Sequence, residues 1–379
     1  MSSTPPTLES KQAVDVRRVG VLGGGQLGRM LALAGYPLGV HCVFVDPSSD
    51  APAGKLAEQL SCDYLAADGQ NALSACEVVT YEFESVPVEA TLELAKNTLV
   101  YPPPKALATA QDRLNEKECF RSLGVPTAPF AAVTSREELV RAVDELGLPA
   151  VLKTRRFGYD GKGQYVLRSA ADVEPAFQAL GGVPLLLEGF VHFDRELSLL
   201  GVRARDGSIV FYPLVENHHR EGILRVTWAP APNLTEALQS EAEGYVRKLL
   251  ERLDYVGVLA VEFFARDGRL YANEMAPRVH NSGHFSIEGA RASQFENHLR
   301  AVLGLPLGSC EVPEPCAMLN LVGDLPTREA VLAVEGAHLH LYDKAPRPRR
   351  KVGHITVRAP NRSELERRVA LLARLPGAG

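Results

Sequence analysis

The chain has 379 residues, of which 46% are hydrophobic and 23% are charged, and its formal net charge is −5. This composition can bury a sizeable core, which excludes extensive disorder, and it lacks the basic surplus of a nucleic-acid-binding protein. The cysteines include no Cys-x-x-Cys pair, and the sequence shows no signal-peptide core and no uninterrupted apolar stretch that could span a bilayer. We therefore expect a reduced, cytoplasmic protein of two or three domains that binds neither nucleic acid nor membrane.

The N-terminal part of the chain predicts a polar tail and then a β-α-β unit. Residues 1–17 are expected to be a flexible tail, and residues 18–112 a first domain that ends just after a run of three prolines. The expected elements are a strand at 18–22, a helix at 29–34, and strands at 41–45, 78–83 and 98–101. A strand, a tight glycine loop, a helix and a second strand within about 30 residues predict a Rossmann-like parallel sheet.

The rest of the chain predicts two mixed α+β domains, at 113–195 and 196–379. In the first, residues 112–150 are expected to be helical with a break at 124–126, and strands follow at 150–153, 164–167 and 185–188. In the second, strands are expected at 197–204, 208–214, 257–264 and 269–273, with a helix at 235–253. A basic cluster at 347–351 lies between short strands near the C-terminus.

The first glycine loop has the spacing Gly23-x-Gly25-x-x-Gly28 between a strand and a helix, and Asp46 ends the next strand. This is the dinucleotide-binding pattern in its usual context, and amides at a helix N-terminus bind anions. Three interpretations stay open on these residues alone: a dinucleotide site, a site for the phosphate of another metabolite, or a tight turn that binds nothing.

A second glycine loop, Gly158 to Gln164, joins two predicted strands and follows Lys153. Its backbone can lie against phosphate oxygens because glycine has no Cβ, and Lys153 and Lys162 add positive charge. It is not a Walker loop, since no helix follows and no Gly-Lys-Ser/Thr occurs. The alternative is a solvated glycine hairpin.

Two carboxylates flank a predicted hairpin with Arg266-Asp267-Gly268 at its turn. A two-residue loop would place Glu262 and Glu274 on opposite faces of the hairpin. A three-residue loop pairs Glu262 with Ala272 and leaves Glu274 as its diagonal neighbour on the same face. We expect the three-residue loop, with which both carboxylates and Asn273 could hold Mg²⁺ together with substrate phosphates. The alternative is a salt bridge to a base such as Arg278.

Two further segments are rich in donors and positive charge. Residues 273–284 are too polar for a core and predict the lining of a site for a small anion. Residues 343–354 contain Lys344 and a run of cations at 347–351, which favours an anion site over a merely solvated face.

Taken together, five motifs resemble one enzyme family. GGGQLGRM (23–30), RFGYDGKGQ (156–164), FYPLVENHH (211–219), NEMAPRVHNSGH (273–284) and RPRRKVGH (347–354) occur in the order found in the N5-carboxyaminoimidazole ribonucleotide synthetase family of the ATP-grasp superfamily. The resemblance covers about residues 18–375 and implies a three-domain ATP-grasp fold. It also implies a ligase that uses ATP and bicarbonate to carboxylate 5-aminoimidazole ribonucleotide through carboxyphosphate, releasing ADP and phosphate, in de novo purine biosynthesis. A homodimer is expected from the resemblance only.

The resemblance also implies site residues, carried over motif by motif. The ATP contacts would be Arg113, Lys153, Gly158, Tyr159, Asp160, Gly161, Lys162, Gly163, Gln164, Glu188, Gly189, Phe190, Val191, Glu196, His219, Asn273 and Glu274. The Mg²⁺ ligands would be Glu262 and Glu274. The nucleotide substrate and bicarbonate would contact Gln26, Leu27, Glu84, Tyr159, Asp160, Lys162, Arg278, His280, Asn281, Ser282, Lys344, Arg350 and Lys351. Catalytic roles are expected for Arg278, Lys153, Asn281, His280 and Lys351.

The sequence departs from the family pattern at two places, and three rival functions stay open. Residues 1–17 precede the usual start, and Arg349 stands where a glycine is more usual. The rivals are a related ligase that uses formate, a nicotinamide oxidoreductase built on the first glycine loop, and a non-catalytic nucleotide-binding regulator. The oxidoreductase leaves Lys153, the second glycine loop and both hairpin acids unexplained, and a regulator does not need a complete metal site.

Overall fold

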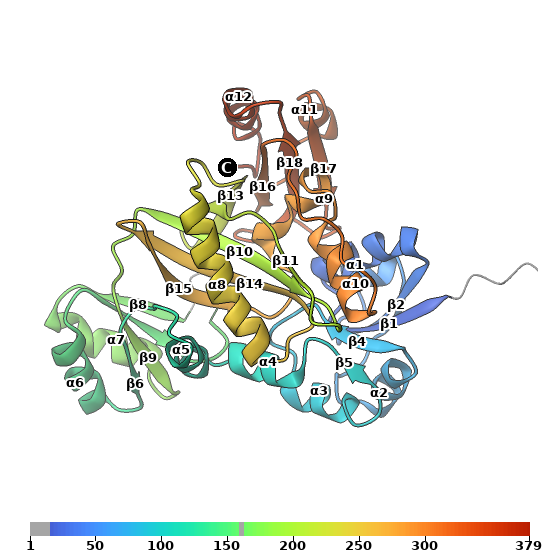
Figure 1. Cartoon of the computed structure of the whole chain (residues 1–379). Helices are drawn as coiled ribbons and strands as arrows, with labels where there is room; N and C mark the ends of the chain where they lie inside the picture. Colours follow the sequence, from blue (N-terminus) through green and yellow to red (C-terminus); the bar gives the residue numbers. More distant parts are fainter. Residues whose placement is uncertain (1–15, 159–162) are drawn as a thin grey trace, which may run out of the picture.

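The computed structural model describes residues 16–158 and 163–379. In this part of the chain the strands form three sheets, and each sheet is built from one consecutive stretch of sequence (Figure 1). No helix of the described residues is both long and apolar enough to cross a membrane.

The first sheet is parallel and has the order β3-β2-β1-β4-β5. Its strands are β1 (Arg17–Leu22), β2 (Val40–Val45), β3 (Glu58–Leu60), β4 (Val78–Tyr81) and β5 (Leu99–Val100). The helices of this stretch are α1 (Gln26–Gly35), α2 (Ala67–Ser74), α3 (Val88–Leu94) and α4 (Pro104–Ala110). The expected Rossmann-like sheet is thereby confirmed, because β1, the first glycine loop, α1 and β2 form a parallel β-α-β unit.

The second sheet is antiparallel, has the order β6-β9-β7-β8, and carries its own small core. Its elements are α5 (Arg113–Ser122), β6 (Phe130–Val133), α6 (Arg136–Leu146), β7 (Ala150–Thr154), β8 (Gln164–Leu167), α7 (Val173–Leu180) and β9 (Leu185–Gly189). The buried cluster of this sheet draws only on residues between Val133 and Leu187. Figure 1 shows this green unit set apart from the rest of the molecule.

The third sheet is antiparallel and has the order β15-β14-β10-β12-β13-β16-β18-β17, with β11 paired to β10. Its strands are β10 (Arg195–Arg203), β11 (Ile209–Phe211), β12 (Val215–Arg220), β13 (Ile223–Ala229), β14 (Gly257–Arg266), β15 (Arg269–Ala276), β16 (Cys316–Val322), β17 (Ala337–Leu341) and β18 (Lys351–Arg358). Its helices are α8 (Glu236–Arg252), α9 (Ser286–Gly289), α10 (Gln294–Val302), α11 (Arg328–Leu332) and α12 (Arg362–Leu372).

Two buried clusters pack on opposite faces of the central strands β10 and β14. One face packs against α8 through Leu199 and Leu259, together with Phe120 of α5. The other face, with Leu200 and Val258, shares one core with α1 and α10 and so joins the third sheet to the first. Successive side chains of a strand point to opposite faces of the sheet. Only every second residue of β10 and β14 therefore faces the space between the first and third sheets.

One sequence-based prediction of secondary structure was wrong. Residues 112–150 were expected to be helical around a single break, but Phe130–Val133 forms β6 between α5 and α6. This four-residue run pairs antiparallel with β9, from Phe130 opposite Glu188 to Val133 opposite Leu185. A short apolar run carries too little periodicity to distinguish strand from helix, and the distant strand β9 decided its structure.

Candidate active site

A cavity of about 920 Å³ opens where the first glycine loop, the β14–β15 hairpin and the basic segment 347–351 meet. Thirteen of the predicted site residues line it: Gln26, Leu27, Glu84, Arg113, Gly158, Glu262, Glu274, Arg278, His280, Asn281, Lys344, Arg350 and Lys351. They come from all three parts of the chain, so the fold assembles one site from motifs that lie far apart in sequence.

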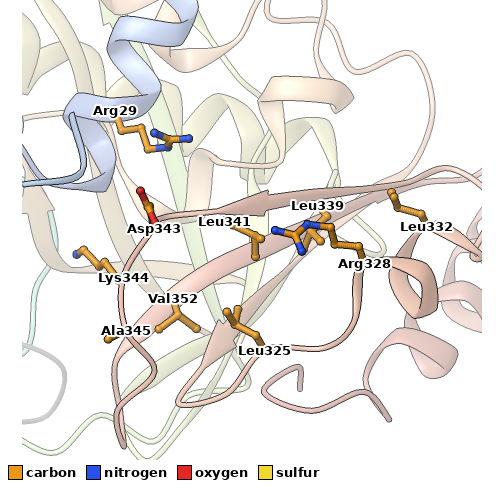
Figure 2. A pocket seen from close by; sticks show the side chains of 10 residues that line it. All are labelled: Arg29, Leu325, Arg328, Leu332, Leu339, Leu341, Asp343, Lys344, Ala345 and Val352. Carbon is orange, nitrogen blue, oxygen red and sulfur yellow. The ribbon is translucent and has the colours of Figure 1, made fainter. Parts of the chain in front are cut away.

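A second cavity, of about 720 Å³, lies beside β17 and α11 (Figure 2). Four of its ten lining residues are leucines, and Arg29, Arg328 and Asp343 contribute charged groups. Lys344 alone among the predicted site residues lines it. The first cavity is therefore the candidate active site.

The amides of the first glycine loop are bound to carboxylates of the protein itself. Gly25 N–H and Gly28 N–H donate to the Glu82 carboxylate at 2.8 and 3.2 Å, and Gly24 N–H donates to Asp46 Oδ2 at 2.7 Å. Burial raises the pKa of Glu82, and these amides oppose that rise by stabilising its charge. Since a dinucleotide pyrophosphate would need the same amides, this geometry argues against the dinucleotide interpretation.

Gly25→Ala is expected to destabilise the protein by about 1–3 kcal/mol, the usual cost of overpacking. Its backbone φ of −71° suits alanine, but a Cβ would lie 2.7 Å from Glu82 Oε1 and displace that carboxylate. The matched control is Gly244→Ala in α8, where a Cβ would meet nothing within 4 Å and helix propensity favours alanine. Thermal unfolding of both variants checks this: a Gly25→Ala melting temperature equal to wild type would contradict the crowding argument.

Charged pairs cross the cavity between the first and third sheets. Arg278 is ion-paired with Glu84, and Lys344 donates to Gln26 Oε1. Burial alone would raise the pKa of Glu84, but the Arg278 guanidinium outweighs it and holds that pKa below its ordinary value. The alternative of a salt bridge to a base therefore holds in part: Arg278 pairs with Glu84, but Glu274 pairs with another base, Arg113, at 3.1 Å.

The hairpin acids Glu262 and Glu274 lie directly opposite each other, but the turn and the strand register that pair them differ from those expected. The turn has two residues, Asp267 and Gly268, both with positive φ (51° and 72°), and Arg266 pairs with Arg269. The three-residue loop was therefore wrong. A β-bulge then shifts the ladder, so that Phe263 pairs with Ala272 but Glu262 pairs with Glu274. The extra residue restores the shared face that a plain two-residue hairpin would remove.

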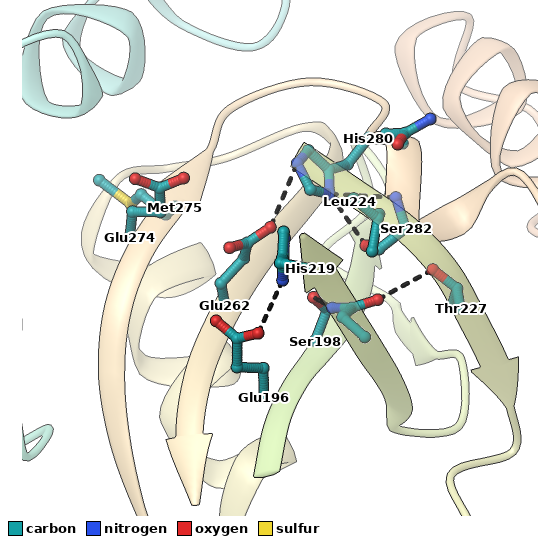
Figure 3. A network of polar contacts seen from close by, with 12 residues as sticks. Glu196, Ser198, His219, Leu224, Thr227, Glu262, Glu274, Met275, His280 and Ser282 are labelled. Carbon is teal, nitrogen blue, oxygen red and sulfur yellow. Dashed lines mark hydrogen bonds and ion pairs between the residues drawn. The ribbon is translucent and has the colours of Figure 1, made fainter. Parts of the chain in front are cut away.

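The two acids are partly exposed, with 17% of the Glu262 side chain and 41% of the Glu274 side chain accessible, and their charges repel each other. Burial, and next the neighbouring Glu274, raise the pKa of Glu262 to about 7. His280 faces Glu262 with its Nε2 at 3.6 Å, while its Nδ1 lies 2.9 Å from Ser282 Oγ (Figure 3). Burial, and then Arg278, lower the pKa of His280 to about 3, so this imidazole is neutral. Two facing carboxylates are suited to a cation, and of the two Glu274 is already ion-paired with Arg113.

A buried chain of ion pairs borders the acids on the side of the second sheet. Glu188 lies 3.1 Å from Lys153 and 3.2 Å from Lys117, and Arg113 donates to Glu274 at 3.1 Å. Burial opposes ionisation of Glu188, but the two lysines lower its pKa to about 2. The ion pair with Glu188 fixes the Lys153 ammonium group near the C-terminal end of β7.

The remaining predicted residues that the structure describes are not part of the cavity lining, and four others lie outside the described residues. Glu196 and His219 are hydrogen-bonded at 2.8 Å on neighbouring strands, and Figure 3 shows them next to Glu262. Gly163 precedes β8, Gln164 begins it, Gly189 ends β9, and Phe190 and Val191 follow β9. Asn273 is the bulge residue, and Ser282 is fully buried. Tyr159, Asp160, Gly161 and Lys162 lie outside the described residues.

Arg349 shows why a glycine is more usual at its position. Its φ is +64°, in the left-handed region that favours glycine. The side chain donates to the Glu221 carbonyl oxygen at 3.1 Å and lies 3.5 Å from its carboxylate. These contacts hold the basic segment against the β12–β13 turn.

Sequence reasoning missed Glu82, Glu116 and Lys117. Glu82 follows a buried strand, and that position was a usable signal, since an acid there faces the carboxyl edge of the parallel sheet. Glu116 and Lys117 gave no signal, because charged residues within a helix ordinarily indicate a solvated face. The structure instead buries both, at 2% and 1% exposed.

Comparison with known proteins agrees with this architecture. Three family models match consecutive stretches: a ribonucleotide synthetase preATP-grasp domain at 16–111, an ATP-grasp domain at 118–295, and a phosphoribosylaminoimidazole carboxylase C-terminal domain at 316–368. The N5-carboxyaminoimidazole ribonucleotide synthase of Pseudomonas aeruginosa is 54% identical over 93% of this chain and 98% of its own length.

Solved structures extend the comparison. The N5-carboxyaminoimidazole ribonucleotide synthetase of Thermus thermophilus is 56% identical, covers 95% of this chain and 99% of its own, and superposes with a TM-score of 0.92. The Aspergillus clavatus enzyme, solved with ADP and 5-aminoimidazole ribonucleotide, is 35% identical with a TM-score of 0.87 and covers 94% and 98% of the two chains. The expected ATP-grasp fold is confirmed, and the chain belongs to the N5-carboxyaminoimidazole ribonucleotide synthase family.

Proposed function

We propose that this protein carboxylates 5-aminoimidazole ribonucleotide with bicarbonate and ATP, giving N5-carboxyaminoimidazole ribonucleotide, ADP and phosphate in de novo purine biosynthesis. The observation that carries the proposal is the single cavity in which the acid pair Glu262 and Glu274 faces Arg278 and the basic segment 347–351. That cavity offers a site for a nucleotide phosphate and one for a reacting polyphosphate side by side. Family membership supplies the substrates.

The chemistry requires activation of bicarbonate, which is a poor electrophile. A bicarbonate oxygen attacks the γ-phosphorus of ATP, ADP leaves, and carboxyphosphate forms. The exocyclic amine then attacks the carboxyl carbon, or CO₂ released from it; phosphate leaves, and the amine loses a proton. The protein's part is to position the reactants, supply positive charge and exclude water, since carboxyphosphate hydrolyses readily.

The residues divide these tasks. Lys153, which is ion-paired with Glu188, would contact the ATP phosphates, and Arg113 would hold Glu274 in position. Arg278, held by Glu84, would bind bicarbonate, and neutral His280 and Asn281 would orient it. Lys344, Arg350 and Lys351 would bind the ribonucleotide phosphate beside Gln26 and Leu27. Tyr159, Asp160 and Lys162 keep their proposed substrate and ATP contacts on the resemblance alone.

The donor set fits Mg²⁺. Glu262 and Glu274 provide two facing carboxylates, and the buried Asn273 Oδ1 has no hydrogen-bond partner among the described residues. Those residues contain no group of three or more His, Cys, Asp and Glu side chains that could bind a metal, so substrate phosphates would complete the shell. When bound, Mg²⁺ would neutralise the phosphate oxygens as the γ-phosphoryl group transfers.

We extend the proposal to domains, assembly and location. Residues 18–112, 113–195 and 196–379 would be the three domains, which the separate buried cluster between Val133 and Leu187 supports. A homodimer follows from the family resemblance. A cytoplasmic location agrees with six cysteines that are all free.

The decisive experiment measures phosphate release from MgATP and bicarbonate, with and without 5-aminoimidazole ribonucleotide. We expect the nucleotide to stimulate release strongly. No stimulation, combined with a thermal shift by ATP, would overturn the substrate assignment and direct the test to formate and glycinamide ribonucleotide. No response to ATP at all would overturn the ligase.

Arg278→Ala is expected to lower turnover by about 10²-fold or more, because a charge-assisted donor at the reacting group is lost, while the KM for ATP changes little. Arg278→Lys should recover only part of the loss, since lysine lacks the guanidinium fork. Steady-state kinetics with each substrate varied checks this, with Arg266→Ala at the exposed hairpin turn as control. Unchanged turnover in Arg278→Ala would end the assignment.

A further inference from the structure

The β-bulge that aligns Glu262 with Glu274 interrupts the hairpin ladder in a buried place. Below the bulge the ladder runs regularly from Arg266 opposite Arg269 to Phe263 opposite Ala272. Above it the ladder resumes one residue out of step, at Glu262 opposite Glu274, which leaves Asn273 as the extra residue. Backbone groups displaced from a ladder need other partners when they are buried.

Helix α5 supplies those partners one after another. Lys117 Nζ donates to the Asn273 carbonyl oxygen at 2.7 Å and lies 3.4 Å from that of Ala272. Met275 N–H donates to Glu116 Oε1 at 2.6 Å, on the other side of the bulge. Glu274 lies between Asn273 and Met275, and its carboxylate accepts a hydrogen bond from Arg113 at 3.1 Å.

These three side chains form one face of a single helical turn. Positions 113, 116 and 117 are spaced i, i+3 and i+4, so they point the same way from α5. They meet three successive residues of β15, at 273, 274 and 275. A helix from the start of the second unit is thereby fitted to the bulge of the third sheet.

The burial of the Glu116 and Lys117 side chains favours a specific role. Lys117 is 1% exposed and Glu116 is 2% exposed, and removing such groups from water is costly unless each is paired or hydrogen-bonded. Lys117 also lies 3.2 Å from Glu188, the partner of Lys153. One ammonium therefore connects the bulge beneath the acid pair to the carboxylate that holds Lys153.

We propose that Glu116 and Lys117 are positioning residues, which fix the bulge at Asn273 and so keep Glu274 on the same face as Glu262. The inference rests on the proposed function in taking that acid pair as the divalent-cation site. Without the two anchors the hairpin can return to the regular register of its two-residue turn. Glu262 would then lie opposite Asn273, and Glu274 would turn to the other face, because a one-residue slip reverses every side chain.

The test uses the full-length protein and direct binding of Mn²⁺ in the presence of ADP, followed by electron paramagnetic resonance. Lys117→Met is expected to weaken Mn²⁺ binding at least about tenfold, and Glu116→Leu is expected to do the same. Glu116→Gln should bind Mn²⁺ as wild type does, because its amide oxygen can still accept the Met275 N–H. Thr127→Val is the matched control, since Thr127 Oγ1 donates to the carbonyl oxygen of the neighbouring Ala272 at 2.9 Å.

The outcomes separate positioning from stability. Thr127→Val should lose some thermal stability and keep Mn²⁺ affinity, whereas Lys117→Met and Glu116→Leu lose affinity beyond any change in melting temperature. Wild-type Mn²⁺ affinity in a folded Lys117→Met or Glu116→Leu protein would overturn the proposal. If Lys117→Met does not fold, equal affinities of Glu116→Leu and Glu116→Gln would overturn it. Mn²⁺ binding is read without turnover, so a failure of the proposed carboxylation appears separately, in the phosphate-release assay on wild type.

Discussion

Replacing Glu274 with glutamine is expected to lower turnover by about 10²–10³-fold, the usual loss when one preorganised electrostatic group is removed. Glutamine keeps the size of the side chain and can still accept from Arg113, which lies 3.1 Å from the present carboxylate. It removes the negative charge from one of the two facing oxygen donors that we assign to Mg²⁺. Turnover at saturating substrates, measured across a series of Mg²⁺ concentrations, checks the prediction, and the variant should need more Mg²⁺ for half-maximal activity.

Asp267→Asn on the same hairpin is the control for this experiment. Asp267 is exposed at the turn and has a φ of 51°, which asparagine tolerates. We expect that variant to match wild type in turnover and in Mg²⁺ dependence. A Glu274→Gln enzyme with wild-type Mg²⁺ dependence would contradict the metal assignment even if its turnover fell.

The second large effect concerns stability: Glu188→Gln is expected to destabilise the protein by about 3–5 kcal/mol, because breaking a buried ion pair leaves uncompensated charge. Glu188 lies between Lys153 and Lys117, and its side chain is 4% exposed. Glutamine would leave both buried ammonium groups without their shared carboxylate. Urea unfolding of the protein without ATP, followed separately by fluorescence and circular dichroism, measures the loss.

A surface pair in the same unit provides the comparison. Glu174 pairs with Arg136 at 2.6 Å, and both side chains are about half exposed. Glu174→Gln should change stability little, since exposed pairs are screened by solvent. Equal losses in the two variants would show that Glu188 is not the buried anchor described here.

The pH dependence of stability follows from the same group. The pKa of Glu188 lies at about 2 in the folded protein, below its ordinary value of 4.5. Its contribution to stability is therefore fully present above about pH 4.5 and is lost as the pH falls toward 2. Between those limits wild type should lose stability more steeply than Glu188→Gln, and parallel curves would contradict the assignment.

Features that depend on neighbouring residues could be predicted from the sequence. The β-α-β unit, the strands on both sides of the second glycine loop and helix α8 follow from apolar periodicity and from glycine and proline positions. The five motifs also predicted the family, and thirteen of the predicted site residues line the cavity. A short stretch of sequence was sufficient for these predictions because each motif contains the chemical groups that identify it.

The tertiary structure decided the features that depend on distant partners. Strand β6 exists because β9 pairs with it, and the first glycine loop binds no dinucleotide in our interpretation because Glu82, 57 residues from Gly25, takes its amides. The hairpin acids face each other through a bulge that helix α5 supports, not through the turn length that the sequence suggested. Local sequence determined which elements form and which chemistry they carry, whereas packing between elements remote in sequence determined their register and therefore which side chains meet.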